Sequence, residues 1–315
     1  MKAKMLWRRT ATMLLTLWIS VSCMAVTVSA HGNMDIGKET SLVVYFGEGG
    51  AGFSNVEFNI YRVANISDTG DCTLTGDFQR YPVSLENLDS SGWRALAQTL
   101  AAYAVRDGLN PFQAKKTGTN GQACFSKLSV GLYLITGDVY KEEGTTYTPE
   151  PMLISLPGLT EKDEWLYDMV VSCKFSSESI PAFVERKVQK VWKDDGREDE
   201  RPKRISVQLL ENGTVVDTVV LSEENNWEYT WENLDGSSRW QVTEAEVSDG
   251  YTVTISQEGT VFIITNTRPY EPPPKLPQTG MLWWPVPALA CGGLLLIVIG
   301  LIVRYRRGGD NENKR

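Results

Sequence analysis

Histidine is almost absent from this chain, which has a single residue of the kind, His31, among 315. A lone histidine near the amino terminus nearly removes Ser-His and Cys-His catalysis and multi-histidine metal sites from consideration. Basic residues are also in the minority, because 31 lysines and arginines face 39 acidic residues. That balance argues against a nucleic-acid-binding protein. The sequence therefore predicts no metal, no cofactor and no nucleic-acid partner.

The first thirty residues have the pattern of an export signal. Basic residues open it, at Lys2, Lys4, Arg8 and Arg9, and residues 13–28 are mostly apolar. Val28-Ser29-Ala30 then matches a small-x-small cleavage pattern. A transmembrane anchor is the alternative, but polar residues interrupt the run at Ser20, Ser22 and Thr27. We expect residues 1–30 to be a signal peptide and the mature protein to be secreted.

Cysteine is scarce, and only Cys72, Cys124 and Cys173 fall in the exported, non-membrane part of the chain. An odd number leaves at least one thiol unpaired. A disulfide between Cys72 and Cys124 is possible outside the cytoplasm. Reduced, buried thiols are the alternative, and the sequence leaves both open.

The carboxyl-terminal region combines an apolar run with a basic end. Residues 281–303 contain no charged side chain and are numerous enough to cross a bilayer as a transmembrane helix. The tail, residues 304–315, opens with three arginines, Arg304, Arg306 and Arg307. Positive residues stay on the cytoplasmic side, so the body of the protein is predicted to lie outside the cell membrane.

A pentapeptide before this run, Leu276-Pro277-Gln278-Thr279-Gly280, distinguishes a wall anchor from a membrane anchor. It fits LPxTG at every fixed position, and residues 276–315 together resemble the sorting signal of sortase substrates in Gram-positive bacteria. The resemblance implies that a sortase breaks the Thr279–Gly280 bond and joins Thr279 to an amine of the peptidoglycan cross-bridge. Pro277 restricts the backbone to an extended or kinked form that suits an enzyme groove. Just upstream, the proline-rich residues 269–275 predict a stiff spacer.

Residues 185–268 read as short alternating strands separated by turn signals, which predicts a small β-sandwich. Asn212-Gly213 is typical of a hairpin turn. No helical pattern interrupts the series. The apolar faces expected in it are Val188 and Trp192, Ile205 to Leu209, Val216 to Leu221, Trp227 with Tyr229 and Trp231, Trp240 and Val242, and Phe262 and Ile264.

Three of these apolar faces each contain one polar residue: Lys190, Glu244 and Asn266. An uncompensated buried charge costs several kcal/mol, so the three side chains are predicted to lie together. One interpretation is a buried ion pair with an amide hydrogen bond. The other is covalent. Burial lowers an amine pKa, and the neutral Lys190 could attack the Asn266 carboxamide while a protonated Glu244 polarises it.

The same stretch resembles the Cna B-type domain of Gram-positive adhesins and pilins over its whole length. The motifs that carry the resemblance are Lys190-Val191-Trp192, Arg201-Pro202, Ser206 to Leu210, Asn226 to Tyr229, Val242-Thr243-Glu244, Gly250-Tyr251 and Ile264 to Thr267. In that family the corresponding lysine and asparagine form an isopeptide bond, which the glutamate catalyses. The resemblance implies these roles for Lys190, Asn266 and Glu244, which favours the covalent interpretation.

Residues 37–178 are also predicted to be mainly β, with strands at residues 42–46, 56–64, 131–135, 152–156 and 165–173. One helix is expected between Leu88 and Gly108, where residues 93–104 carry an apolar stripe at helical spacing. The predicted fold is therefore mainly β. It has two immunoglobulin-like or Cna B-type sandwiches in tandem, the first with an inserted helix, plus the terminal signal and transmembrane segments.

The first domain resembles the amino-terminal domain of pilin-like, Cna-related surface proteins. The resemblance is carried by Val56 to Val63, Val130 to Leu134, and Trp165 to Asp168 leading to Lys174. In backbone pilins a lysine in a Tyr-Pro-Lys type motif receives the threonine of the next subunit. Lys174 stands near that place, although Cys173 replaces the proline. A solvated lysine at a strand end is the alternative.

Three classes of function follow from these patterns. The first is a wall-anchored minor or basal pilin or adhesion stalk, with sortase, peptidoglycan and other pilin subunits as partners. The second is a monomeric adhesin that binds host matrix or glycan. The third, a wall-bound enzyme, is the weakest, because no catalytic constellation is visible beyond autocatalytic isopeptide formation.

Overall fold

The computed structural model describes residues 34–162, 164–179, 183–268, 297–299 and 301. The chain divides into a compact body that ends at Pro269 and a second unit from Tyr270 onward. The signal peptide, the proline-rich spacer, the LPQTG motif and nearly all of residues 281–303 lie outside the described residues. Among the residues that are described, no helix is both long and apolar enough to span a membrane.

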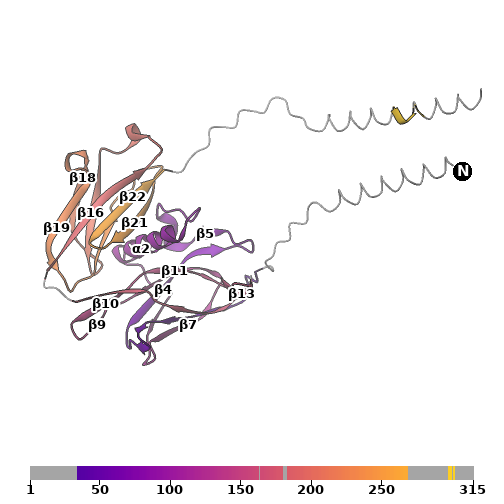
Figure 1. The fold of residues 1–315 in the computed structure, drawn as a ribbon, viewed down its shortest axis with the longest axis horizontal. Coiled ribbons are helices and arrows are strands. Elements are labelled where there is room, and N and C mark those ends of the chain that lie inside the picture. Colours follow the sequence, from indigo (N-terminus) through magenta and orange to yellow (C-terminus); the bar gives the residue numbers. More distant parts are fainter. Residues whose placement is uncertain (1–33, 163, 180–182, 269–296, 300, 302–315) are drawn as a thin grey trace, which may run out of the picture. The chain divides into compact units, whose positions relative to one another are not determined.

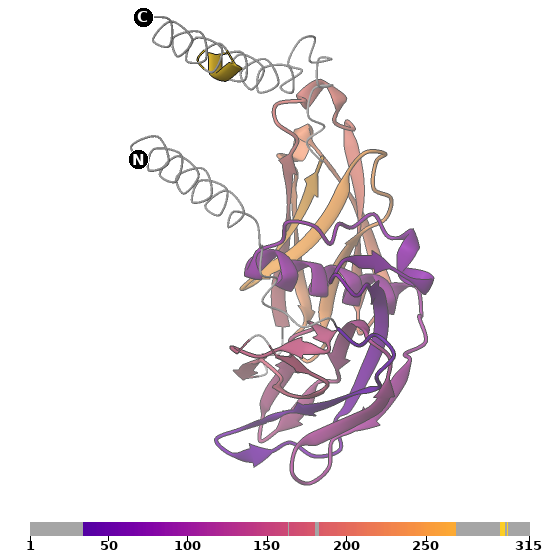
Figure 2. The same cartoon turned by 90° about the vertical axis from the view of Figure 1, so that its right-hand side faces the viewer.

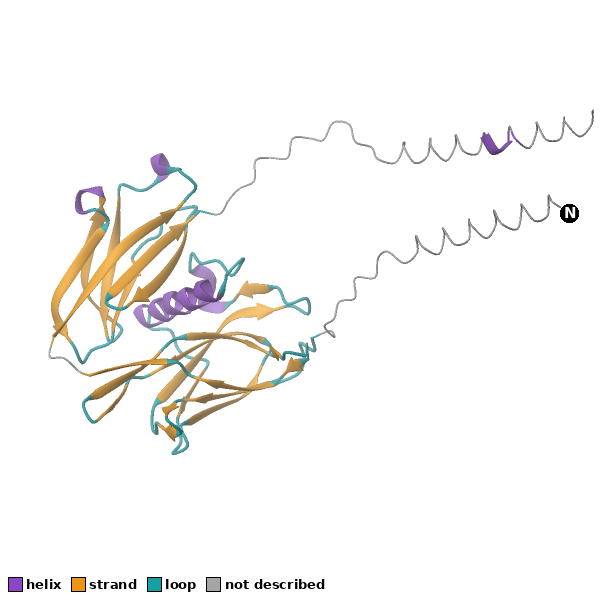
Figure 3. Cartoon of the chain, in the orientation of Figure 1, coloured by secondary structure: helices purple, strands orange, loops and turns teal. Residues whose placement is uncertain are grey.

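Strands dominate the body, as the alternating sequence predicted (Figures 1 and 3). The amino-terminal half contains β1 (Thr40–Tyr45), β2 (Gly47–Glu48), β3 (Ala51–Gly52), β4 (Glu57–Ile66), β5 (Cys72–Leu74), a 3-10 turn (Gly76–Arg80), α2 (Ser90–Arg106), β6 (Gln113–Lys116), β7 (Gln122–Leu128), β8 (Gly131–Gly137), β9 (Tyr140–Glu142), β10 (Thr145–Pro149), β11 (Met152–Leu156), β12 (Gly158–Leu159), β13 (Trp165–Leu166), β14 (Asp168–Ser172) and β15 (Phe175–Ser179).

The carboxyl-terminal half contains β16 (Phe183–Lys193), β17 (Arg204–Glu211), β18 (Thr214–Ser222), β19 (Glu228–Asp235), β20 (Trp240–Glu244), β21 (Thr252–Glu258) and β22 (Val261–Thr267). Two short 3-10 turns, Glu198–Glu200 and Glu223–Asn225, lie between them. The strands form a four-stranded sheet, β19-β16-β22-β21, and a three-stranded sheet, β18-β17-β20. Their apolar faces meet in a common core, so this half is a β-sandwich.

The first and last strands of this sandwich, β16 and β22, lie side by side and run parallel. Every second residue of β22 is buried, beginning with Phe262 and ending with Asn266. In the register of the pair, Lys190 is opposite Ile264 and Trp192 is opposite Asn266. The lysine and the asparagine therefore lie on the same face of neighbouring strands.

The amino-terminal half is built from several small sheets, with order β14-β1-β7, β15-β10-β9 and β11-β8-β4-β5, the last joined by β6 along β4. A second core cluster fills this half, around Leu42, Phe46, Phe58 and Phe125. These sheets form a more divided arrangement than the single inserted-helix sandwich that the sequence predicted. One of them, β15-β10-β9, consists of strands that were not among those predicted.

Helix α2 begins and ends where local signals predicted. The Asp89 side chain accepts a hydrogen bond from the Gly92 N–H at 2.7 Å, which caps the first turn. Gly108, just past the last turn, has a φ of +61°, a backbone conformation that glycine adopts without steric cost. The helix buries Leu96, Ala97 and Thr99 through Ala104, far more than one stripe.

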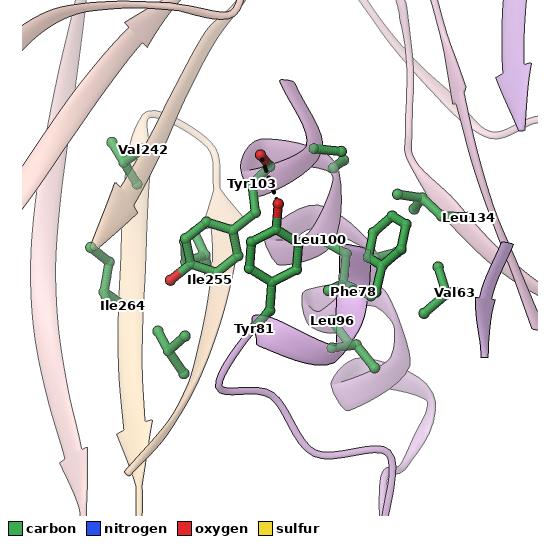
Figure 4. Packing of buried hydrophobic residues seen from close by; sticks show 14 of the residues in the cluster. Val63, Phe78, Tyr81, Leu96, Leu100, Tyr103, Leu134, Val242, Ile255 and Ile264 are labelled. Atoms are coloured by element: carbon green, nitrogen blue, oxygen red, sulfur yellow. Dashed lines mark hydrogen bonds between the residues drawn. The ribbon is translucent and has the colours of Figure 1, made fainter. Parts of the chain in front are cut away.

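This wide burial arises because α2 contacts both halves of the body (Figure 2). One core cluster runs from Val63 and Leu134 in the amino-terminal half, through Leu96 and Leu100, to Ile255 in the sandwich (Figure 4). The two predicted domains therefore share a hydrophobic core. A second core cluster lies within the amino-terminal half alone.

Two details of the sandwich differ from expectation. Strand β21 was missing from the predicted series, so the strand with Glu244 is the third from last and not the one before last. Tyr229 was assigned to a buried face with Trp227 and Trp231, but 41% of its surface is exposed. Tyr229 still packs edge-on against Trp231, with ring centroids 5.2 Å apart.

Candidate functional site

The three polar residues singled out in the sequence come together inside the carboxyl-terminal sandwich. Lys190 lies on β16 and Asn266 on β22, in one sheet, while Glu244 ends β20 in the other. Only 5% of Lys190 is exposed, and Glu244 and Asn266 are fully buried. The two sheets thus place an amine, a carboxyl and a carboxamide in one water-shielded space.

Contacts between the three side chains are direct. The Lys190 Nζ lies 3.7 Å from Glu244 Oε2, and the Asn266 Nδ2 donates a hydrogen bond to Glu244 Oε1 at 3.1 Å. Glu244 therefore bridges the amine and the amide. The amine also lies 3.5 Å from the carbonyl oxygens of Val191 and Ile264.

Trp192 encloses the lysine on one side. The Lys190 Nζ sits 4.2 Å from the centre of a Trp192 ring, whose electron-rich face is attractive to an ammonium group. Val188, Phe262 and Ile264, which lie on the same two strands as Lys190 and Asn266, belong to the buried apolar cluster. The amine is thus confined in a mostly apolar space.

Burial moves both ionisable groups of the site toward their neutral forms. It lowers the pKa of the Lys190 amine, and the nearby Glu244 charge opposes this only in part. It raises the pKa of the Glu244 carboxyl, against the influence of Lys190 and of the Asn266 hydrogen bond. The physical cause is the same in each case, because an apolar interior destabilises charge.

Hydrogen bonding at the site is incomplete. Glu244 Oε2 and Asn266 Oδ1 are buried without a hydrogen-bond partner. Buried polar atoms usually find partners, and an exception needs a physical explanation. A neutral amine, a carboxylic acid and a carboxamide with a free carbonyl oxygen are the ingredients of an amide-exchange reaction. The alternative from the sequence, a buried ion pair with an amide hydrogen bond, uses the same three side chains.

A second polar network lies next to the site and was not assigned a role from sequence. The Arg201 guanidinium donates two hydrogen bonds to the Asp194 carboxylate, from Nε to Oδ2 at 2.6 Å and from Nη2 to Oδ1 at 2.8 Å. The Tyr251 hydroxyl donates to Asp194 Oδ2 at 3.3 Å, and its ring packs edge-on against Trp192. Asp194 is buried, so this network holds the tryptophan that encloses Lys190.

We expect Asp194→Asn to destabilise the protein by about 1–3 kcal/mol, because the Arg201 fork loses its charged acceptor. Hydrogen bonds from Arg201 lower the pKa of Asp194 in the folded state. Its contribution to stability is therefore present above the unfolded-state pKa, about 3.9, and is lost as the pH falls through the lower folded-state value. Urea unfolding at pH 7 and below pH 4 measures this; a gap between wild type and variant that does not narrow in acid would contradict it.

Lys174 is exposed, in the short link between β14 and β15. Its backbone carbonyl accepts a hydrogen bond from the Glu150 N–H at 2.8 Å, which fixes the link while leaving the side chain in solvent. Cys173, beside it, is buried, and burial raises the pKa of its thiol. This position is compatible with both interpretations of Lys174 left open by the sequence.

The possible disulfide between Cys72 and Cys124 is not formed. All three described cysteines are free thiols. Cys72 begins β5, which pairs with β4, whereas Cys124 lies on β7, which pairs with β1 in a different sheet. The two residues belong to different layers of the amino-terminal half.

Comparison with known proteins assigns part of the chain. Residues 186–267 match the Cna protein B-type domain. The collagen adhesin of Staphylococcus aureus is 31% identical over 101 residues, which are 29% of this chain and 8% of that protein. The chain therefore spans less than a tenth of the length of this curated relative. The findings show similarity to a Cna B-type domain over residues 186–267 and to a small part of one Gram-positive adhesin.

Solved structures overlap with the chain only loosely. A single B repeat unit of the S. aureus collagen-binding surface protein is 18% identical, with 74% of this chain and 99% of that chain covered, at a TM-score of 0.27. The SpaE basal pilin from Lactobacillus rhamnosus GG is 13% identical, with 75% and 93% covered, at a TM-score of 0.30. TM-scores this low do not define a common fold. The assignment of the carboxyl-terminal half as a β-sandwich therefore depends on the strand pairing in this structure.

Proposed function

We propose that this protein is a wall-anchored minor or basal pilin or adhesion stalk, in which an isopeptide bond between Lys190 and Asn266 locks the Cna B-type domain. The observation that carries the proposal is the buried contact of an amine, a carboxyl and a carboxamide between the first and last strands. The Cna B-type match over residues 186–267 supports the same chemistry.

The reaction needs no external reagent. The neutral Lys190 amine adds its lone pair to the Asn266 side-chain carbonyl carbon, while Glu244, which contacts both Lys190 Nζ and Asn266 Nδ2, carries the proton between the two nitrogens. The resulting tetrahedral carbon collapses, the bond to Nδ2 breaks, and the proton lost from Lys190 leaves with that nitrogen through Glu244. One ammonia molecule is released and one amide bond remains.

The covalent interpretation agrees better with the site than a permanent ion pair. An ion pair at 3.7 Å in an apolar interior gains Coulomb energy but leaves Glu244 Oε2 without a hydrogen bond. A neutral amine and a neutral acid avoid the desolvation cost, and both pKa shifts go in that direction. The same neutral forms are those that the reaction requires.

Mechanical function follows from strand order. Because β16 and β22 are the first and last strands, tension that enters at one end of the domain and leaves at the other would pass through the bond. Residues between Lys190 and Asn266 would then carry little of the load. Thr279, in the proposed sorting signal thirteen residues further on, would join this load path to peptidoglycan.

Intact mass tests the bond. We expect the wild-type protein to be lighter than its sequence mass by ~17 Da, the mass of the ammonia released on condensation. Glu244→Gln removes the acid but keeps the size and shape of the side chain, and its mass should equal the sequence mass. A wild-type mass without the deficit, or a Glu244→Gln protein that retains it, contradicts the proposed chemistry.

Fractionation of a Gram-positive host tests the anchor. We expect Thr279→Ala to move the protein from the wall fraction to membrane and medium, because sortase loses its acyl site. Gln278→Ala is the matched control, since it changes the one variable position of the motif. Wall-bound Thr279→Ala protein would show that another element anchors the chain.

The same wall extracts separate a pilin from a single-copy stalk. A pilin gives a ladder of sortase-dependent bands, whereas a stalk gives a single band. If Lys174 joins subunits, Lys174→Ala should abolish the ladder, and Lys162→Ala, another exposed lysine of the same half, should leave it intact.

A further inference from the structure

A pocket of about 310 Å³ lies where the two halves of the body meet, and none of the three crosslinking residues lines it. The wall comes from β10 and β15 in the amino-terminal half, from α2, and from β20, β21 and the loop before β20 in the sandwich. A cavity of this volume is at the small end of those that hold organic ligands. The site is complete only when both halves are in place.

Polar groups cover much of the pocket wall. Hydroxyl groups come from both halves, with Thr146, Thr148 and Ser176 on one side and Ser237 on the other. The Ser238 hydroxyl also lines the pocket but donates to Glu211 Oε1 at 2.7 Å. The Oγ1 of Thr146 is buried without a hydrogen-bond partner. Such groups bind polyhydroxylated molecules through several directional hydrogen bonds.

Two guanidinium groups reach the pocket, Arg186 from β16 and Arg239 from the residue before β20. Arg239 Nη1 donates to the Gly137 carbonyl oxygen at 3.1 Å, and Arg186 Nη1 donates to the Glu185 carbonyl oxygen at 3.2 Å. Within the described parts of the chain neither guanidinium forms an ion pair. Arg186 Nε is also buried without a partner. Both guanidinium groups therefore retain N–H donors that are free to bind a ligand.

Nearby carboxylates leave these cations largely uncompensated. Glu150 lines the pocket but faces Arg94 at 3.9 Å, and Glu178 is exposed on β15. The charge of the Asp138 carboxylate acts to raise the pKa of Arg239 and so favours its charged form. Burial, however, raises the pKa of Asp138 itself and disfavours its negative charge. Burial also lowers the pKa of Arg239, which shows that its charge is poorly solvated. A ligand with a negative charge would relieve this cost.

We propose that this pocket binds a carboxylate-bearing sugar, with Arg239 and Arg186 on the carboxylate and the surrounding hydroxyl groups on the ring. A planar guanidinium matches a carboxylate with two parallel hydrogen bonds. The volume restricts the ligand to about one or two rings. This inference does not depend on the crosslink, since no residue is shared between the two sites.

Calorimetric titration of the full-length chain in detergent tests the proposal, with N-acetylneuraminic acid and glucuronic acid as acidic probes and glucose as the neutral one. We expect saturable binding of an acidic probe and none of glucose. Arg239→Gln should weaken binding about tenfold or more, because a charge-assisted hydrogen bond is lost. Arg204→Gln, the same change at an exposed position outside the pocket, should bind as wild type does.

Arg186→Gln provides a second variant, so that the test holds even if Arg239→Gln fails to fold. Binding that is unchanged in the folded arginine variants would overturn the proposal. So would equal binding of glucose, or a lack of saturable binding of both acids. Full-length Glu244→Gln should retain acid binding, which separates failure of this site from failure of the crosslink.

Discussion

Lys190→Ala is expected to lower the midpoint of thermal unfolding by roughly 10–20 °C, the largest effect of any single substitution considered. Without the proposed bond, the unfolded chain between residues 190 and 266 gains conformational entropy. A cross-link of that span stabilises the folded state by roughly 4–5 kcal/mol, because it restricts the unfolded chain. The substitution also removes the buried Lys190 side chain beside the fully buried Glu244, which leaves a cavity in the core. Both effects destabilise the folded state in the same direction.

Calorimetry and timed proteolysis measure this change. Lys187→Ala is the matched control, because Lys187 lies on the same strand as Lys190. Its side chain forms a partly exposed ion pair with Glu228. Such pairs contribute about 0–1 kcal/mol, so its midpoint should shift little. Equal shifts for the two lysine variants would contradict a covalent role for Lys190.

The proximity of the crosslinking residues could be predicted from sequence because it depends on strand period and burial alone. Lys190, Glu244 and Asn266 each interrupt an apolar face, and a polar group on such a face must find a partner inside. No knowledge of distances was needed for that step. The formation of the bond itself stays a prediction that the mass measurement tests.

Features that depend on contacts between distant segments could not be read in the same way. Strand β21 is a different case. It pairs with β22, and its alternation is regular, with Val253 and Ile255 buried between polar residues, so this strand was a local signal that the prediction missed. The pocket has walls from residues more than a hundred positions apart, and no local pattern signals that they meet. The positions of Cys72 and Cys124 in the sequence do not indicate which sheet each residue joins, so their separation could not be predicted.

Helix α2 shows the largest difference between sequence and structure, and it has a physical role. β21 is the edge strand of its sheet, and an uncovered edge leaves backbone N–H groups without partners. The amino-terminal half satisfies three of them. The Val253 N–H bonds to the Pro82 carbonyl oxygen at 2.8 Å, Ile255 to Thr99 Oγ1 at 2.7 Å, and Gln257 to Gln98 Oε1 at 3.1 Å.

The same helix also packs near the crosslinking site. Strand β20 carries Glu244, and α2 contacts both β20 and β21, at the side of the sandwich where the two sheets end. The Tyr103 hydroxyl and the Arg106 guanidinium lie 3.5 Å from the Glu244 carbonyl oxygen. The helix therefore covers the backbone at the end of β20, next to the side chain whose apolar environment keeps Glu244 neutral.

Leu100→Asp is expected to destabilise the body by about 3–5 kcal/mol or more, because it places an unpaired carboxylate in the shared core. Hydrogen exchange of the Val253, Ile255 and Gln257 amides should accelerate as the helix leaves the edge strand. If the helix supplies the dry environment, the ~17 Da mass loss should also become slow or incomplete.

Two further variants show whether docking of α2, and not global unfolding, is responsible. Thr99→Val keeps the volume but leaves the buried Ile255 N–H without an acceptor, so exchange should accelerate at that amide with a cost of about 1–3 kcal/mol. Val105→Asp puts the same charge on the exposed side of α2 and should leave the edge amides protected. Protected edge amides in Leu100→Asp would mean that β21 is held without the helix. A complete crosslink in that variant would mean that the sandwich buries Glu244 by itself.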